Sequence, residues 1–99
     1  MMTRFLCEAK EMSQALTTAE SIRDQIMEEF RGTPLQRRIL FIRADEAPIT
    51  RIQDRARAHV LLKLLNHPDT DRLLGRFQEM ASEEYPARVQ LEINPASLA

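Results

Sequence analysis

The chain has 99 residues, 43% of them hydrophobic, and a formal net charge of −1 at pH 7. This length suits a single domain over residues 1–99 with a modest core. One cysteine excludes an internal disulfide, and neither a bilayer-spanning apolar run nor a signal peptide is recognisable, so we expect a cytoplasmic protein without metal, cofactor or membrane contact.

The first half of the chain predicts a strand, a helix and a second strand. A short strand is expected over residues 3–8. Apolar residues then recur with helical spacing over residues 11–31, and Gly32 stops this helix. Residues 38–43 should form a strand that is apolar on both faces, and residues 45–48 should break it.

The second half predicts a long strand, a second helix and a final strand. Residues 51–63 are expected to form one strand, with small and aliphatic residues on one face and mainly cationic residues on the other. A helix should follow the proline-containing entry at residues 66–69 and end before Pro86. Residues 88–93 alternate between polar and apolar, as in a half-buried strand.

The order β-α-β-β-α-β is that of the ferredoxin-like split βαβ arrangement. Two amphipathic helices need one sheet face on which to bury their apolar stripes, and four strands can supply that face. We therefore predict an α+β fold, a ferredoxin-like βαββαβ sandwich with a four-stranded antiparallel sheet and two helices on one face.

Basic residues concentrate in the middle of the sequence. Residues 36–63 contain seven bases and three acids, a net charge of +4, so the rest of the chain carries −5. Cations on the helix-free face of the predicted strand 51–63 repel one another, and phosphate would relieve that repulsion. The candidate phosphate contacts are Arg51, Arg55, Arg57, His59 and Lys63, with Arg37 and Arg38 extending the patch.

Two other interpretations stay open. The basic strand is equally consistent with an ordinary solvated sheet face, if acids such as Glu92 on neighbouring strands compensate its charge. The scarcity of aromatic residues disfavours base stacking, so only backbone contact with nucleic acid is expected. Leu40 and Ile42 should be exposed on the sheet face away from the core, where the chain end at 96–99 or a loop covers them, or else another chain or domain docks.

No catalytic or metal site is predicted. His59 and His67 lack metal-ligand spacing, and no triad of nucleophile, base and acid is recognisable. Cys7 is expected to be a small core residue. Gly32 and Gly75, the only glycines, cannot build a phosphate-binding loop, which excludes an ATPase. A small hydrolase stays open only because a fold does not determine a function.

Two segments resemble the C-terminal domain of the PriA helicase, the bacterial primosomal replication protein N′. Residues 47–63 are similar to that family's proline-containing entry and its basic strand, which ends in aliphatic residues and lysine. Residues 92–98 are similar to the family's Asp-Val-Asp-Pro-x-Ser-Leu ending. The element order is similar over the whole chain. Ala56 and Ala58 depart from the family, which favours aromatic residues there.

The resemblance implies a non-catalytic accessory domain of a PriA-type helicase that binds branched or single-stranded DNA and supports replication restart. It implies replication-fork DNA, the single-stranded DNA-binding protein and other PriA domains as partners. The positions that match the family's basic residues are Arg51, Arg55, Arg57 and Lys63. The rival interpretation is a protein- or ligand-binding regulatory βαββαβ domain that dimerises or docks through Leu40 and Ile42.

Overall fold

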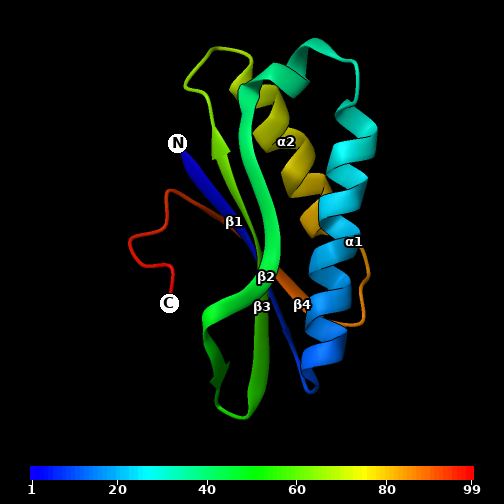
Figure 1. Cartoon of the computed structure of the whole chain (residues 1–99), viewed down its shortest axis with the longest axis vertical. Coiled ribbons are helices and arrows are strands. Elements are labelled where there is room, and N and C mark those ends of the chain that lie inside the picture. Colours follow the sequence, from blue (N-terminus) through cyan, green and yellow to red (C-terminus); the bar gives the residue numbers. More distant parts are fainter.

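The computed structural model describes residues 1–99, and its elements form one antiparallel sheet with two helices on one face (Figure 1). The strand order β2-β3-β1-β4 confirms the predicted ferredoxin-like arrangement. Neither helix is both long and apolar enough to cross a membrane. The elements are β1 (Met2–Ala9), α1 (Met12–Phe30), the 3-10 helix η1 (Pro34–Arg38), β2 (Ile39–Ile52), β3 (Arg55–Leu64), α2 (Thr70–Ala81) and β4 (Arg88–Ile93).

The core lies between the sheet and the two helices. Phe5 of β1 and Phe77 of α2 meet edge to face with ring centroids 5.4 Å apart, and Phe30 of α1 approaches Phe77 at 6.4 Å. Cys7 is fully buried in this layer, and burial raises the pKa of its thiol to about 12. It is therefore a core residue, as predicted, because its thiol stays protonated at neutral pH.

Local signals set the ends of α1. At its start, the backbone N–H of Glu11 donates to Oε1 of Gln14 at 3.3 Å, which satisfies a donor that the helix leaves unpaired. At its end, Gly32 has a φ of +72°, a left-handed conformation that glycine adopts without steric cost. Pro34 then starts η1, a short helix that the sequence pattern does not predict.

The single strand predicted over residues 51–63 is wrong in its first part. β2 continues through Pro48 to Ile52, with a register irregularity between residues 46 and 51 where the break was predicted. The chain then reverses at Gln53 and Asp54, whose φ angles are +50° and +65°. Two successive residues with positive φ form a tight turn between antiparallel strands. Such turns usually contain glycine, and because neither residue is glycine here, the sequence gives no turn signal. Arg51 therefore belongs to β2, beside the basic strand.

The last residues run back over the helix-free face of the sheet (Figure 1). The reversal begins at Asn94, which has a φ of +49° and whose N–H donates to the carbonyl of Met2 at 2.7 Å. Nη1 of Arg4 then donates to the carbonyl oxygens of Leu98 and Ala99 at 2.8 and 3.2 Å. The chain end thus covers Arg4, and not the strand segment around Leu40 that was one expected alternative.

Candidate nucleic-acid interface

The helix-free face of the sheet carries basic residues and, opposite them, acids from the neighbouring strands. The strand register sets one acid opposite each of three basic residues; the pairs are Arg57 with Glu8, Arg4 with Glu92, and His59 with Asp45. Opposite charges on adjacent strands stabilise the sheet. The centre of the face is therefore charge-compensated rather than uniformly positive.

Arg57 lies on this face as predicted, but only 6% of it is exposed. Its Nη1 donates to the carbonyl oxygen of Ile49 at 3.1 Å, and its Nε lies 3.7 Å from Oε2 of Glu8. The distal part of β2, residues 47–52, therefore lies over the guanidinium group. A phosphate could reach Arg57 only after β2 had moved, so Arg57 is a structural cation in this conformation.

His59 is also 6% exposed, and its Nδ1 has no hydrogen-bond partner. Burial is the main cause that lowers the pKa of this imidazole below its ordinary value, and the nearby positive charge of Arg4 lowers it further. The carboxylate of Asp45 opposes this shift only in part. His59 is therefore neutral at pH 7 and adds no positive charge to the face.

Arg4 is the most deeply buried cation of the face, with 2% exposure. Its Nε and Nη2 donate to Oε1 of Glu92 at 3.0 and 2.8 Å, while its Nη1 donates to the chain end. Arg4 thereby ties β1 to β4 and to residues 98–99. Sequence reasoning missed Arg4. The signal that could have found it is its place inside β1, because an arginine in a strand that is buried on both faces must find partners within the domain.

Among the predicted phosphate contacts, the accessible cations lie toward the two ends of β3. Arg55 at its start and Lys63 near its end are exposed and form no ion pair. Arg37 of η1 is likewise exposed and unpaired, close in sequence to the start of β2, which pairs with the end of β3. The other two predicted contacts are engaged: Arg38 lies 3.4 Å from Asp69, and Arg51 lies 3.6 Å from Asp54.

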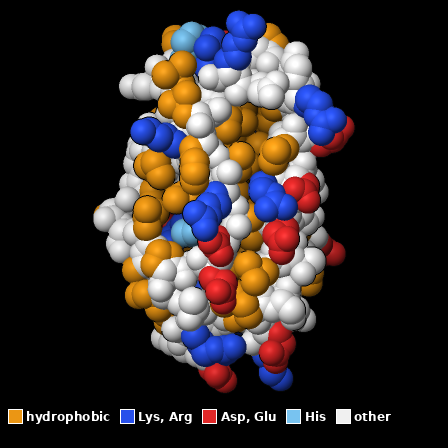
Figure 2. Space-filling view, in the orientation of Figure 1, with side chains coloured by type: hydrophobic (Ala, Val, Ile, Leu, Met, Phe, Trp, Pro, Cys, Tyr) orange, Lys and Arg blue, Asp and Glu red, His pale blue; other side chains and the backbone are white.

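The free cations form an extended track rather than a compact patch. Lys63 lies eight positions after Arg55, which corresponds to about 26 Å along a strand at about 3.3 Å per residue. Phe41 is 44% exposed and lies opposite Lys63 in the register, so one aromatic ring accompanies that end of the track. Figure 2 shows, on the side where β2 lies in front, basic side chains scattered among acidic and apolar ones.

Leu40 and Ile42 do not share an exposed face, which corrects the predicted docking pair. A register irregularity between Ile39 and Phe41 shifts the side chains of β2 by one position. Leu40 is 53% exposed, whereas Ile42 turns to the helix side and packs against the core. The exposed neighbour of Leu40 is Phe41.

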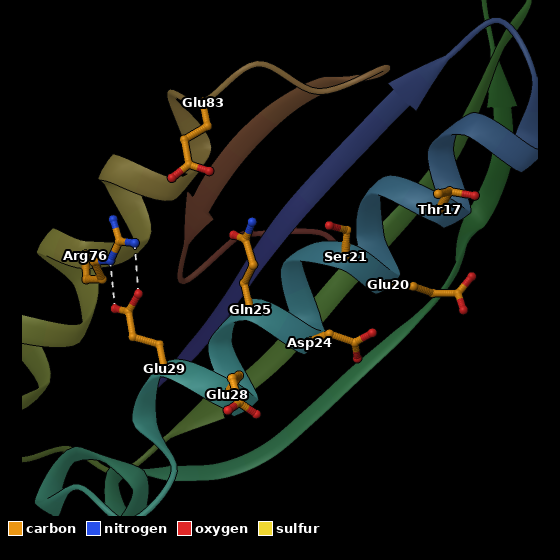
Figure 3. Close-up of a pocket in the computed structure, with 9 residues that line it drawn as sticks. All are labelled: Thr17, Glu20, Ser21, Asp24, Gln25, Glu28, Glu29, Arg76 and Glu83. Atoms are coloured by element: carbon orange, nitrogen blue, oxygen red, sulfur yellow. Dashed lines mark hydrogen bonds and ion pairs between the residues drawn. The ribbon is translucent and has the colours of Figure 1, made fainter.

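The largest hollow of the molecule lies between α1 and α2 and has a volume of about 900 Å³. It is open to solvent and no hydrophobic residue lines it; its lining residues are Thr17, Glu20, Ser21, Asp24, Gln25, Glu28, Glu29, Arg76 and Glu83 (Figure 3). Arg76 donates to both carboxylate oxygens of Glu29, at 2.7 and 2.8 Å, and this contact lowers the pKa of the carboxyl. Five carboxyl groups against one guanidinium repel anions, so the hollow is unsuited to a nucleotide.

His67 and possible metal-binding clusters are the remaining candidates for a site. Nδ1 of His67 accepts a hydrogen bond from the backbone N–H of Asp69 at 3.1 Å, so His67 orders the entry to α2. No group of three or more His, Cys, Asp or Glu side chains is placed to hold a metal ion.

Comparison with protein-family models, curated proteins and solved structures finds no match for this chain. The resemblance to the PriA C-terminal domain therefore rests on residues 47–63, residues 92–98 and the order of the elements. Residues 47–63 form the distal part of β2 and most of β3, and residues 92–98 form the end of β4 and the segment over Arg4.

Proposed function

We propose that this chain is a non-catalytic accessory domain that contacts the sugar-phosphate backbone of branched or single-stranded DNA, as expected of a PriA-type C-terminal domain that supports replication restart in the cytoplasm. One observation carries the proposal. Among the cations of the helix-free face of β3, Arg55 and Lys63 stay exposed and unpaired while Arg57 is buried. They lie in the segment that resembles the PriA domain.

The chemistry of these groups fits backbone contact without base readout. Arg55 can donate two hydrogen bonds to one phosphate, and Lys63 adds a point charge about 26 Å away, with Arg37 at the same end. Phe41 beside Lys63 offers a single ring on which one unpaired base could stack. So few contacts support weak binding with a shallow salt dependence, which favours exposed single-stranded segments.

The alanines at the family's aromatic positions do not weaken this proposal. Ala56 and Ala58 are fully buried, and Ala58 belongs to the core beneath the helices. Side chains at these two positions face away from the surface that carries Arg55 and Lys63, because successive strand residues alternate between faces. Aromatic rings there would enlarge the core rather than stack on DNA.

Charge reversal at the free cations tests the proposal. We expect Arg55→Glu with Lys63→Glu to abolish binding to labelled fork and single-stranded DNA in fluorescence anisotropy. The matched control is Arg31→Glu with Arg72→Glu, which changes the net charge equally on the helical side and should retain most of the binding. For single-stranded DNA, Arg55→Ala with Lys63→Ala should reduce the slope of log K against log salt by about 1.4, since each phosphate contact contributes about 0.7. Unchanged binding by the folded double Glu variant, or equal loss in the control, would overturn the proposal.

A further inference from the structure

The outer edge of β2 has no partner strand. β2 pairs only with β3, and its segment Phe41–Glu46 keeps a regular register with that strand. An unpaired edge presents backbone N–H and C=O groups that can bind another strand. β2 lies in front of the sheet in Figure 1, so Figure 2 looks onto this edge.

Apolar side chains flank this edge on both sides (Figure 2). On the helix side, a groove of about 210 Å³ is lined mainly by apolar residues, which are Ile26, Met27, Phe30, Ile39 and Ile42. Met27 is 53% exposed there, and Leu40 and Phe41 of β2 itself are 53% and 44% exposed. Exposed apolar groups that gather along an open strand edge are typical of an interaction surface.

The charges on the edge are complementary to a second copy of the same strand. Arg43 and Asp45 lie on the helix-free face of β2, and their side chains are exposed and joined at 2.7 Å. The backbone N–H of Glu46 and the guanidinium of Arg43 lower the pKa of the Asp45 carboxyl, which keeps it ionised at neutral pH. Each copy therefore offers one fixed cation and one fixed anion two residues apart.

An antiparallel pairing about a two-fold axis at Ala44 sets Arg43 of one copy opposite Asp45 of the other, twice by symmetry. Residues opposite each other in an antiparallel pair share a face and have Cα atoms about 4.5–5.5 Å apart, so two ion pairs can form. Moving the axis to Arg43 or to Asp45 would instead set like charges opposite each other. The charges thus specify one register.

We infer that the β2 edge is an interface for a second copy of this chain, paired about Ala44 into a continuous eight-stranded sheet with all four helices on one face. Such an interface is isologous, because each copy contributes the same segment. The regular segment is short, and a register irregularity limits it at each end, so we expect a concentration-dependent equilibrium between monomer and dimer. This inference goes beyond DNA binding, since neither Arg55 nor Lys63 lies in the edge strand.

Sedimentation equilibrium of the full chain over a wide concentration range, with charge-swapped variants, tests the interface. Arg43→Asp sets like charges opposite each other at both pairs, and we expect it to weaken dimerisation roughly tenfold. Asp45→Arg should act in the same way, and the double variant R43D/D45R should restore the wild-type constant, because it exchanges the two charges and keeps the pair within each strand. A wild-type chain that stays monomeric throughout, or a double variant as weak as the singles, would overturn the inference.

A cysteine at the symmetry axis tests the register independently. In the dimer, residue 44 lies opposite its own copy at a Cα separation that a disulfide can span, so Ala44→Cys should cross-link under mild oxidation. Thr50→Cys is the matched control, because it is exposed on the same strand but far from the axis. Cys7 is buried and does not compete. Equal cross-linking of both variants, or none of Ala44→Cys, would contradict the register.

Discussion

Replacing Arg57 by alanine should destabilise the fold, whereas replacing Arg55 by alanine should not. The two arginines are two residues apart in β3 and face the same side of the sheet. Arg55 is exposed and forms no ion pair, while Arg57 is 6% exposed and donates to the carbonyl of Ile49. They form a matched pair that separates a structural cation from an accessible one.

The magnitude follows from what Arg57→Ala leaves behind. A hydrogen bond that involves a charged group contributes about 1.5–3 kcal/mol, so loss of the contact with Ile49 costs about 2 kcal/mol. The cost of leaving Glu8 without Arg57 is smaller, because its side chain is 19% exposed and Arg88 lies opposite it in β4. Loss of the aliphatic stem beneath β2 adds to the total. We expect Arg57→Ala to cost about 2–3 kcal/mol, and Arg55→Ala less than about 0.5 kcal/mol.

Urea unfolding followed by far-UV circular dichroism measures the change in the free energy of unfolding for each variant, and thermal unfolding measures the change in the midpoint temperature. In a domain of this size, 1 kcal/mol shifts the thermal midpoint by roughly 4–8 °C, so Arg57→Ala should lower it by roughly 10–20 °C. Arg57→Met is the control for packing, because it keeps most of the stem and removes the charge. Equal stabilities of the Arg57→Ala and Arg55→Ala variants would refute the burial argument and return Arg57 to the candidate phosphate contacts.

Two further changes probe the helix-free face and the hairpin. The pKa of His59 in the folded state lies below its ordinary 6.5, so between these two pH values the unfolded chain binds more protons than the folded one. The free energy of unfolding is therefore highest above about pH 6.5, and it decreases as the pH falls through the folded pKa. His59→Gln should flatten this part of the pH profile in urea titrations, and an unchanged profile would exclude His59 as its source. Gln53→Asn with Asp54→Gly should stabilise the domain by roughly 0.5–1 kcal/mol in the same assay, since Asn-Gly favours positive φ at both positions; a loss of stability would contradict the turn.

The element order could be predicted because each element carries its own local pattern. The apolar stripe of α1 buries Ala15, Ile22 and Ile26, and Gly32 marks its end without reference to the rest of the chain. The boundaries of β2 could not be predicted, because the turn at residues 53–54 uses two non-glycine residues with positive φ. The irregularity at Leu40 has no local signal either, yet it decides which side chains of β2 are exposed.

The candidate site was harder to predict, since its electrostatics depend on strand pairing. Sequence alternation correctly places Arg57 and His59 on the helix-free face, but their burial depends on Ile49, Glu8 and the path of β2. These contacts join residues that local spacing cannot relate. Alternating cations along one strand therefore predict the sheet face on which they lie. Which of them are accessible depends on the register of the neighbouring strands.

The small number of free cations constrains how the domain could act on DNA. If the proposed function holds, three phosphate contacts from Arg37, Arg55 and Lys63 would give a salt slope of only about 2 on a single strand, and binding would be weak at physiological ionic strength. Weak contacts become effective when a second binding element raises the local concentration of DNA. A covalently attached helicase would do this, and pairing through the β2 edge would do it by doubling the contacts. Because the edge and the cations lie on different strands, both routes leave Arg55 and Lys63 accessible.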